Sequence, residues 1–148
     1  MVQKNLFAHC KNYIEKILNG FENRKVEILH DLESESKSTA GDKHETGRAM
    51  IQLEREKLGD QIKEFELYQK LLIHLKNHTH SKYVKLGTVV MTNHSNYYIS
   101  FPAKQCVINS KTYYCISAQS PIGKLLLGKK VGEKITFNNR SSVILEIN

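Results

Sequence analysis

The sequence lacks the features that mark membrane, secreted and disulfide-rich proteins. No apolar run reaches 18 residues, so the sequence predicts no membrane-spanning helix. Residues 1–13 carry charged and aromatic side chains where a secretory signal would have an apolar run, so we expect no signal peptide. The three cysteines are an odd number without a close pairing motif, which argues against a disulfide framework and a zinc site. We therefore expect a cytoplasmic protein with free thiols.

Acidic residues are scarce after residue 80. Residues 1–80 contain 13 Lys and Arg and 13 Asp and Glu, whereas residues 81–148 contain 9 basic and 2 acidic side chains. The second part therefore carries the whole formal net charge of +7, which indicates two modules with different electrostatic roles. A basic module suits nucleic acid or an acidic protein surface. Lysines that merely keep a small β domain soluble would give the same composition, and the sequence leaves both possibilities open.

Apolar residues recur every seven positions in two long segments of the first half, which span about residues 3–35 and 44–77. Seven-residue spacing is typical of a helix that packs along a partner helix. We predict an antiparallel α-helical coiled-coil hairpin over residues 1–78, with a tip loop near residues 38–48. Each arm would be about 50 Å long at 1.5 Å per residue. The residues in the two series are Phe7, Ile14, Phe21 and Ile28, then Ile51, Leu58, Phe65 and Leu72.

Short runs rich in Val, Ile, Thr and Tyr dominate the second half and are separated by turn residues. One helix is expected among them, because Ser120 is a good N-cap, Pro121 suits the first helical position and Gly128 suits the helix stop. We therefore predict an α+β chain. After a linker at residues 77–83, residues 83–148 would form a small antiparallel β domain with one short helix.

Residues 116–137, ISAQSPIGKLLLGKKVGEKITF, resemble the C-terminal signature of the bacterial Gre transcript-cleavage factors. In that family a Ser-Pro-Ile opens a short helix that closes in Leu/Ile-Gly-Lys and leads into a strand. The resemblance implies an FKBP-like domain, without implying prolyl isomerase activity. It also implies that this segment binds RNA polymerase. The residues expected to do so are Ser120, Pro121, Ile122, Leu126, Gly128 and Lys129.

The expected tip of the hairpin carries a second, partial match to the family. Gre factors have a Gly-Asp-x-x-Glu-Asn-Ala-Glu-Tyr motif there, and residues 41–45 of this chain read Gly-Asp-Lys-His-Glu. Asp42 and Glu45 therefore match the family's acids. Residues 46–49, Thr-Gly-Arg-Ala, stand where Asn, Ala, Glu and Tyr are typical. The match supports polymerase binding more directly than it supports stimulated cleavage.

The resemblance implies a specific role for the tip acids. Two-metal phosphodiester hydrolysis uses two divalent ions about 4 Å apart, and Mg²⁺ typically takes only one or two carboxylates besides phosphate and water. Asp42 and Glu45 would reach the polymerase active centre through its secondary channel and hold an Mg²⁺ jointly with the enzyme. The substrate would be the nascent RNA 3′ end of a backtracked transcript, with Lys43 and Arg48 on RNA phosphate. The protein would be a monomeric accessory factor, with no metal when isolated, and not itself an enzyme.

The acids and histidines of the hairpin also fit simpler roles. Asp42 as a helix N-cap, with Glu45 completing a capping box, would need no metal. A homologue that only binds the polymerase channel, without stimulating cleavage, would fit the departure at residues 46–49. His74 and His78 have the i, i+4 spacing of a metal site, with His80 nearby. Histidines near a helix C-terminus are also favoured by the helix dipole.

Overall fold

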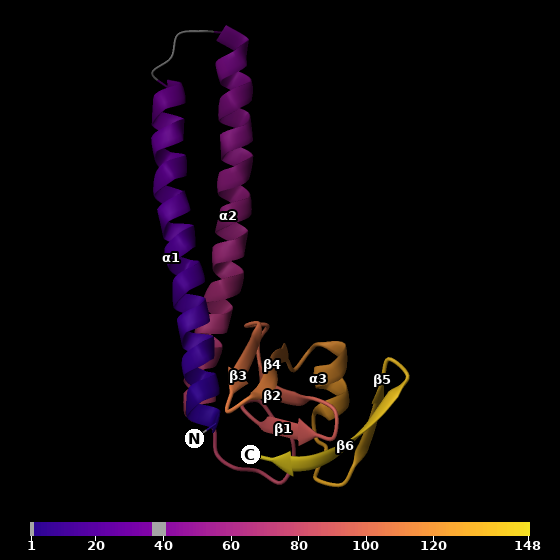
Figure 1. Cartoon of the computed structure of the whole chain (residues 1–148). Helices are drawn as coiled ribbons and strands as arrows, with labels where there is room; N and C mark the ends of the chain where they lie inside the picture. Colours follow the sequence, from indigo (N-terminus) through magenta and orange to yellow (C-terminus); the bar gives the residue numbers. More distant parts are fainter. Residues whose placement is uncertain (1, 37–40) are drawn as a thin grey trace. The chain divides into compact units, whose positions relative to one another are not determined.

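Two long helices precede a six-stranded sheet in the computed structural model, which describes residues 2–36 and 41–148. The side chains of residues 36 and 41–44 lie outside this description. Figure 1 shows the order of the elements along the chain, and this arrangement confirms the predicted α+β class. The elements are α1 (Val2–Ser36), α2 (Gly41–Lys76), β1 (Val89–Thr92), β2 (Asn96–Ser100), β3 (Gln105–Ile108), β4 (Lys111–Ser117), α3 (Pro121–Leu126), β5 (Lys134–Phe137) and β6 (Arg140–Ile147).

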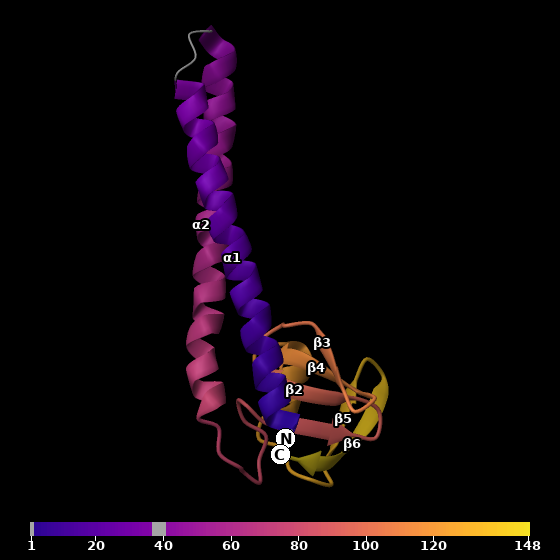
Figure 2. The same cartoon turned by 60° about the vertical axis from the view of Figure 1, so that its left-hand side comes forward.

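Residues 14–68 form one compact unit, the hairpin unit, in which α1 and α2 run side by side (Figures 1 and 2). The rings of Phe21 and Phe65 meet edge to face with centroids 5.4 Å apart. Ile28 and Leu58 are buried. Apolar residues at the predicted seven-residue spacing therefore do pack between the two helices.

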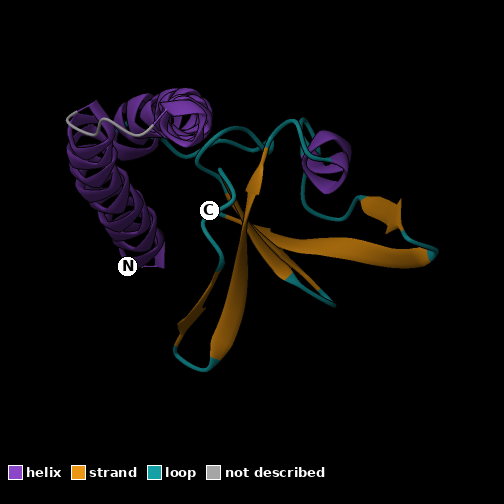
Figure 3. Ribbon diagram, turned by 90° about the horizontal axis from the view of Figure 1, so that it is seen from above, coloured by secondary structure: helices purple, strands orange, loops and turns teal. Residues whose placement is uncertain are grey.

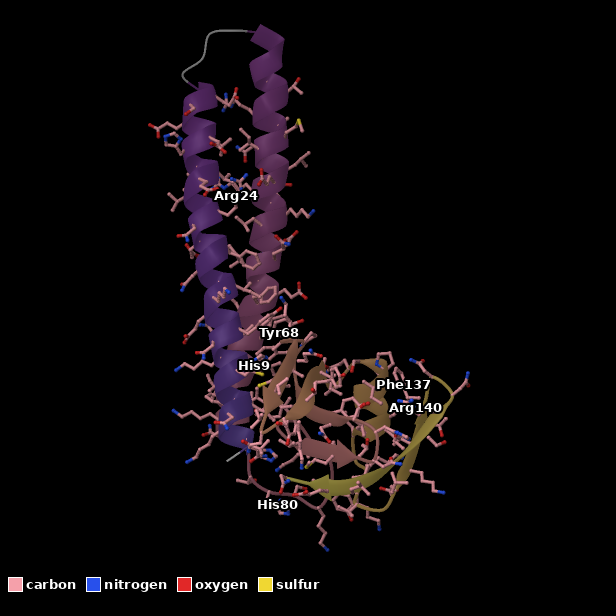
Figure 4. The ribbon with its side chains drawn as sticks, viewed as in Figure 1. His9, Arg24, Tyr68, His80, Phe137 and Arg140 are labelled. Carbon is pink, nitrogen blue, oxygen red and sulfur yellow. The ribbon has the colours of Figure 1, made fainter. Side chains whose placement is uncertain are left out.

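An ion pair also joins the helices of the hairpin unit. Arg24 reaches from α1 toward α2 (Figure 4), and its Nε donates a hydrogen bond of 2.8 Å to Oε1 of Glu54. Its Nη1 donates to Glu27, one turn further along α1, also at 2.8 Å. These hydrogen bonds raise the pKa of the Arg24 guanidinium. Because both acids are exposed, the ion pair contributes little to the stability of the hairpin unit.

Residues 2–13 and 69–148 form the second compact unit, which we call the sheet unit. It includes the start of α1, where Leu6 and Cys10 are fully buried. Nε2 of His9, labelled in Figure 4, lies 2.7 Å from the carbonyl oxygen of Ala103. The compact units therefore divide the chain differently from the predicted domains 1–78 and 83–148. The physical reason is that the start of α1 buries apolar side chains within the sheet unit.

The sheet has the strand order β3-β4-β2-β1-β6-β5 and is mixed. Strands β2 and β4 are parallel, with Tyr98 opposite Cys115, and every other neighbouring pair is antiparallel. The predicted antiparallel sheet therefore contains one parallel pair, because β3 occupies the outer edge and β4 returns beside β2. Two-residue turns at 109–110 and 138–139 have positive φ throughout. Such turns match the twist of the hairpins β3–β4 and β5–β6 that they close.

Helix α3 supplies two residues to the core of the sheet unit and lies beside the sheet in Figure 3. Ile122 is 9% exposed and Leu126 is fully buried. Burial of such side chains stabilises the fold by about 1.5–3 kcal/mol each. The core cluster consists of Val84, Val90, Ile99, Ile122, Leu126, Ile135, Ile144 and Ile147.

Candidate functional site

The acidic motif begins inside a helix. Helix α2 starts at Gly41, so residues 41–48, which were predicted to be part of the tip loop, are helical. Asp42 is the second residue of α2, and the capping position would fall on Ala40, outside the described residues. The side chain of Asp42 also lies outside the described residues, so the capping-box hypothesis stays a prediction. Acids near a helix start are favoured by the helix dipole, which is the physical reason the helix can extend through this motif.

The described part of the tip has two distinct sides. Glu45 and Arg48 are exposed. Gly47 faces α1 instead, because a Cβ added there would lie 3.3 Å from Oε1 of Glu35. Position 45 is three residues from both 42 and 48, so it neighbours each of them on the helix surface. The side chains of Asp42 and Lys43 themselves lie outside the described residues, so their predicted roles stay predictions.

Among the residues whose side chains are described, no group of three or more His, Cys, Asp or Glu could hold a metal ion. The predicted i, i+4 site at His74 and His78 therefore has no third protein ligand of these types within that part of the chain. Nδ1 of His78 lies 3.1 Å from the carbonyl oxygen of Leu86. The partner of the His78 ring is therefore a backbone carbonyl and not a second metal-binding side chain.

The segment predicted to bind polymerase has a well-defined local structure. Oγ of Ser120 accepts a 3.1 Å hydrogen bond from the Gly123 amide and donates a 2.6 Å hydrogen bond to the Ser117 carbonyl. This geometry confirms Ser120 as the N-cap, with Pro121 in the first helical position. Gly123 was not singled out from the sequence. A Cβ there would lie 2.1 Å from the Ser117 oxygen, and a glycine inside a helical pattern was the available signal.

Burial separates the predicted binding residues into two groups. Ile122 and Leu126 belong to the core, so they position α3 and are not available for direct contact. Gly128 has φ +80, and its amide donates to the Val84 carbonyl at 2.9 Å. The Lys129 carbonyl accepts a hydrogen bond of 2.8 Å from the Val84 amide. Pro121 and Gly128 are exposed, and Ser120 and Lys129 are half-buried. Five further exposed residues of α3 and the turn after it define what we call the α3 surface: Lys124, Leu125, Leu127, Lys130 and Val131.

The charge of the chain is concentrated in the sheet unit. Residues 2–13 and 69–148 contain 13 Lys and Arg and 2 acids, a formal net charge of +11, and residues 14–68 contain 9 basic and 13 acidic residues, a net charge of −4. Both acids of the sheet unit are already hydrogen-bonded. Glu133 accepts from the Lys130 amide at 2.7 Å, and Glu146 accepts from the Asn148 side chain at 2.8 Å. The sheet unit thus has a strong attraction for negatively charged partners.

No helix in the described part of the chain combines the length and the apolar character needed to cross a membrane.

Comparison with known proteins found a family match in the C-terminal segment. Residues 82–148 match the family described as "Transcription elongation factor, GreA/GreB, C-term". The chain is also similar to the crystal structure of the GreA factor homolog 1 (Gfh1) protein of Thermus thermophilus. The sequence identity is 20%, the alignment covers 91% of this chain and 92% of that one, and the TM-score is 0.36. No curated protein sequence matches this chain.

Proposed function

We propose that the protein binds RNA polymerase and stimulates cleavage of backtracked transcripts, because residues 82–148 match the family of GreA/GreB transcription elongation factors. The family match is the observation that carries this proposal. Gre-family proteins are accessory factors of RNA polymerase, and in this proposal the polymerase supplies the nuclease centre. The chain contributes a docking surface at one place and two acids at another.

The α3 surface is the proposed docking site. Leu125 and Leu127 are 37% and 40% exposed, and Lys124 and Lys130 flank them. An apolar centre with a basic rim suits an acidic protein surface that has an apolar patch. The rest of the +11 sheet unit would increase the association rate with such a partner. Ile122, Leu126 and Gly128 act indirectly here, because they hold α3 and its C-terminal turn in place.

The tip acids are the proposed contribution to cleavage. Asp42 and Glu45 lie three apart in α2, and Glu45 is exposed. Two carboxylates suit an Mg²⁺ ion that a second protein also coordinates, whereas the described residues offer no complete site. When bound, the ion would stabilise negative charge on the phosphodiester and lower the pKa of an attacking water. Asp42 and Glu45 would hold it in place, and Lys43 and Arg48 would contact RNA phosphate.

A cleavage assay on stalled elongation complexes tests this proposal. We expect the parent protein to shorten the transcript from its 3′ end, and Asp42→Asn and Glu45→Gln to abolish this effect while polymerase binding is retained. Asp60→Asn is the matched control, because Asp60 is an exposed acid of the same helix. Loss of the charge at position 42 weakens its interaction with the dipole of α2 by only about 0.3–1 kcal/mol, so we expect the variant to stay folded. A variant at Asp42 or Glu45 that cleaves like the parent would contradict the metal-holding role of that residue.

The second candidate function is binding without stimulated cleavage. It is favoured by Arg48, an exposed base at the position where the family motif has an acid. Arg48 is three residues after Glu45 and neighbours it on the helix surface, where its positive charge would repel a bound cation. In this case the parent would bind the polymerase and would not shorten stalled transcripts at any magnesium concentration. The same assay thus separates the two functions.

A further inference from the structure

Three cysteines from distant parts of the chain belong to the sheet unit. Cys10 lies in α1, Cys106 in β3 and Cys115 in β4. Sγ of Cys10 lies 3.9 Å from Sγ of Cys115, although 105 positions separate the two residues. Cys106 is opposite Tyr113 in the pairing of β3 with β4. Because Cys115 is two residues after Tyr113, Cys106 and Cys115 lie on the same face of the sheet. The proposed function uses none of these thiols.

The distance between the sulfurs of Cys10 and Cys115 is short enough for a covalent bond to form by a small movement. A disulfide bond is about 2.05 Å long, so the two sulfurs need to approach each other by about 2 Å. Rotation about the Cα–Cβ bonds of two cysteines covers a movement of this size. The contact therefore places two thiols in a position to be oxidised as a pair.

The surroundings of the pair make its two thiols chemically different. The hydrogen bond with Cys115 lowers the pKa of Cys10 against the effect of burial, and the Ser100 hydroxyl, 3.7 Å away, lowers it further. The same hydrogen bond between the thiols, together with burial, raises the pKa of Cys115. Since the thiolate is the attacking species in disulfide exchange, Cys10 is the nucleophile of the pair.

Two simpler roles for the pair lead to different expectations. Among the residues whose side chains are described, no group of three or more His, Cys, Asp or Glu could hold a metal ion, so the pair belongs to no such group there. A buried cysteine can also serve as a small apolar side chain. Packing alone does not require two sulfurs to be in contact, and it predicts that both thiols persist when the protein is exposed to an oxidant.

We propose that Cys10 and Cys115 form a reversible disulfide bond that fastens the start of α1 to β4. The co-reactant is a low-molecular-weight disulfide such as oxidised glutathione. The Cys10 thiolate attacks one sulfur of that molecule and releases the first glutathione thiolate. The Cys115 thiolate then attacks Sγ of Cys10, breaks the mixed disulfide and releases the second. The two released thiolates take up the protons lost by Cys10 and Cys115, so one disulfide is reduced while another forms.

Burial controls the rate of this reaction, whereas the native geometry controls its equilibrium. Cys10 is fully buried and Cys115 is 7% exposed, so the first attack requires the start of α1 to open transiently. Local opening costs less free energy than global unfolding. When the start of α1 closes on β4 again, the native contact holds the sulfurs together and favours the disulfide relative to the unfolded chain. The bond thus secures the start of α1 under oxidising conditions and releases it under reducing ones.

Equilibration of the full chain with reduced and oxidised glutathione tests the pairing. After acid quenching and alkylation, mass spectrometry of peptides should find Cys10 linked to Cys115. The equilibrium constant for this link should be at least about thirtyfold larger in the native protein than in concentrated urea, the lower end of the usual effect of a native disulfide. Equal constants, two alkylated thiols despite excess oxidised glutathione, or a main product that links Cys106 would overturn the proposal.

Variants and hydrogen exchange test the consequence of the bond. Cys10→Ala should abolish the link, and Cys106→Ala is the matched control, because it removes the remaining thiol and should leave the link unchanged. In the oxidised parent protein, amide hydrogen exchange over residues 2–13 should slow, and dithiothreitol should reverse the change. Unaltered exchange, or loss of the link in Cys106→Ala, would contradict a bond that fastens α1 to β4. This proposal does not depend on the proposed function in transcription.

Discussion

The Sγ atoms of Cys10 in α1 and Cys115 in β4 lie 3.9 Å apart, 105 positions distant in the sequence. The sulfur of Cys10 also lies 3.7 Å from Oγ of Ser100 in β2. Both cysteines are free thiols and both are buried. The hydrogen bond with Cys10, together with burial, raises the pKa of Cys115. The pair therefore marks where the start of α1 is packed into the sheet unit.

Thiol labelling should follow this burial. Cys106 is only half-buried, so we expect iodoacetamide to modify it first, although burial raises the pKa of its thiol as well. Cys10 and Cys115 should react only when the sheet unit opens, since alkylation needs an accessible thiolate. Mass spectrometry of peptides from the native protein gives the order. If Cys10 were labelled as fast as Cys106, the start of α1 would be detached in solution.

Substitution of two helical glycines should have opposite effects on stability. Gly123→Ala places a Cβ 2.1 Å from the Ser117 oxygen, and we expect it to reduce the free energy of unfolding by about 1–3 kcal/mol. Gly20→Ala has nothing within 4 Å of the new Cβ. It should stabilise α1 by about 0.8–1 kcal/mol. Urea unfolding of the two variants measures both changes. A neutral Gly123→Ala would mean that the Ser117–Gly123 segment relaxes freely.

Adjacent leucines of the α3 segment should separate stability from binding. Leu126→Ala empties a fully buried position and should cost about 2–5 kcal/mol of stability. Leu127→Ala changes a side chain that is 40% exposed and should alter stability by no more than about 0.5 kcal/mol. We expect Leu127→Ala to remain stably folded at 25 °C and still to bind polymerase more weakly, as measured by surface plasmon resonance. Unchanged affinity in Leu127→Ala and Leu125→Ala together would argue against the α3 surface as the docking site.

Polymerase affinity should also depend on salt. The net charge of +11 is gathered in the sheet unit, and exposed charges are screened over about 8 Å at physiological ionic strength. We therefore expect the dissociation constant to rise as salt is added, mainly through a slower association rate. The same titration with Lys124→Met and Lys130→Met should show a weaker dependence. Affinity that is constant across ionic strength would mean that the contact is mainly apolar.

Stability should fall as the pH is lowered below about 6.5, the ordinary pKa of histidine. Burial lowers the pKa of His78 in the folded state, so below this pH the unfolded chain binds a proton that the folded chain does not. The free energy of unfolding is therefore highest above the unfolded pKa and decreases as the pH falls toward the folded pKa. Urea unfolding between neutral and mildly acidic pH measures this loss. His78→Gln should flatten the profile, and His80→Gln, the control, should not.

Local sequence patterns were sufficient for several parts of this protein. The seven-residue recurrence of Phe21, Ile28, Leu58 and Phe65 predicted the helical hairpin, because side chains at that spacing share one face of a helix whatever else the chain does. Ser120 and Pro121 predicted the start of α3 for a similarly local reason, since capping depends on residues within one turn. The C-terminal signature likewise predicted the family that residues 82–148 match.

Tertiary structure decided what depends on residues far apart in the chain. The parallel pairing of β2 with β4 follows from the edge position of β3, and no pattern within a single strand records its neighbour. In α3, which has six residues, periodicity is too short to show that Leu126 is core while Leu125 and Leu127 are exposed. The ends of both helices join the sheet unit and raise its charge from +7 over residues 81–148 to +11. A cavity beside His78 arises in the same way, because long-range packing alone brings together the residues that line it: Gln3, Lys4, Phe7, Leu75, Lys76, His78, Gly87 and Tyr98.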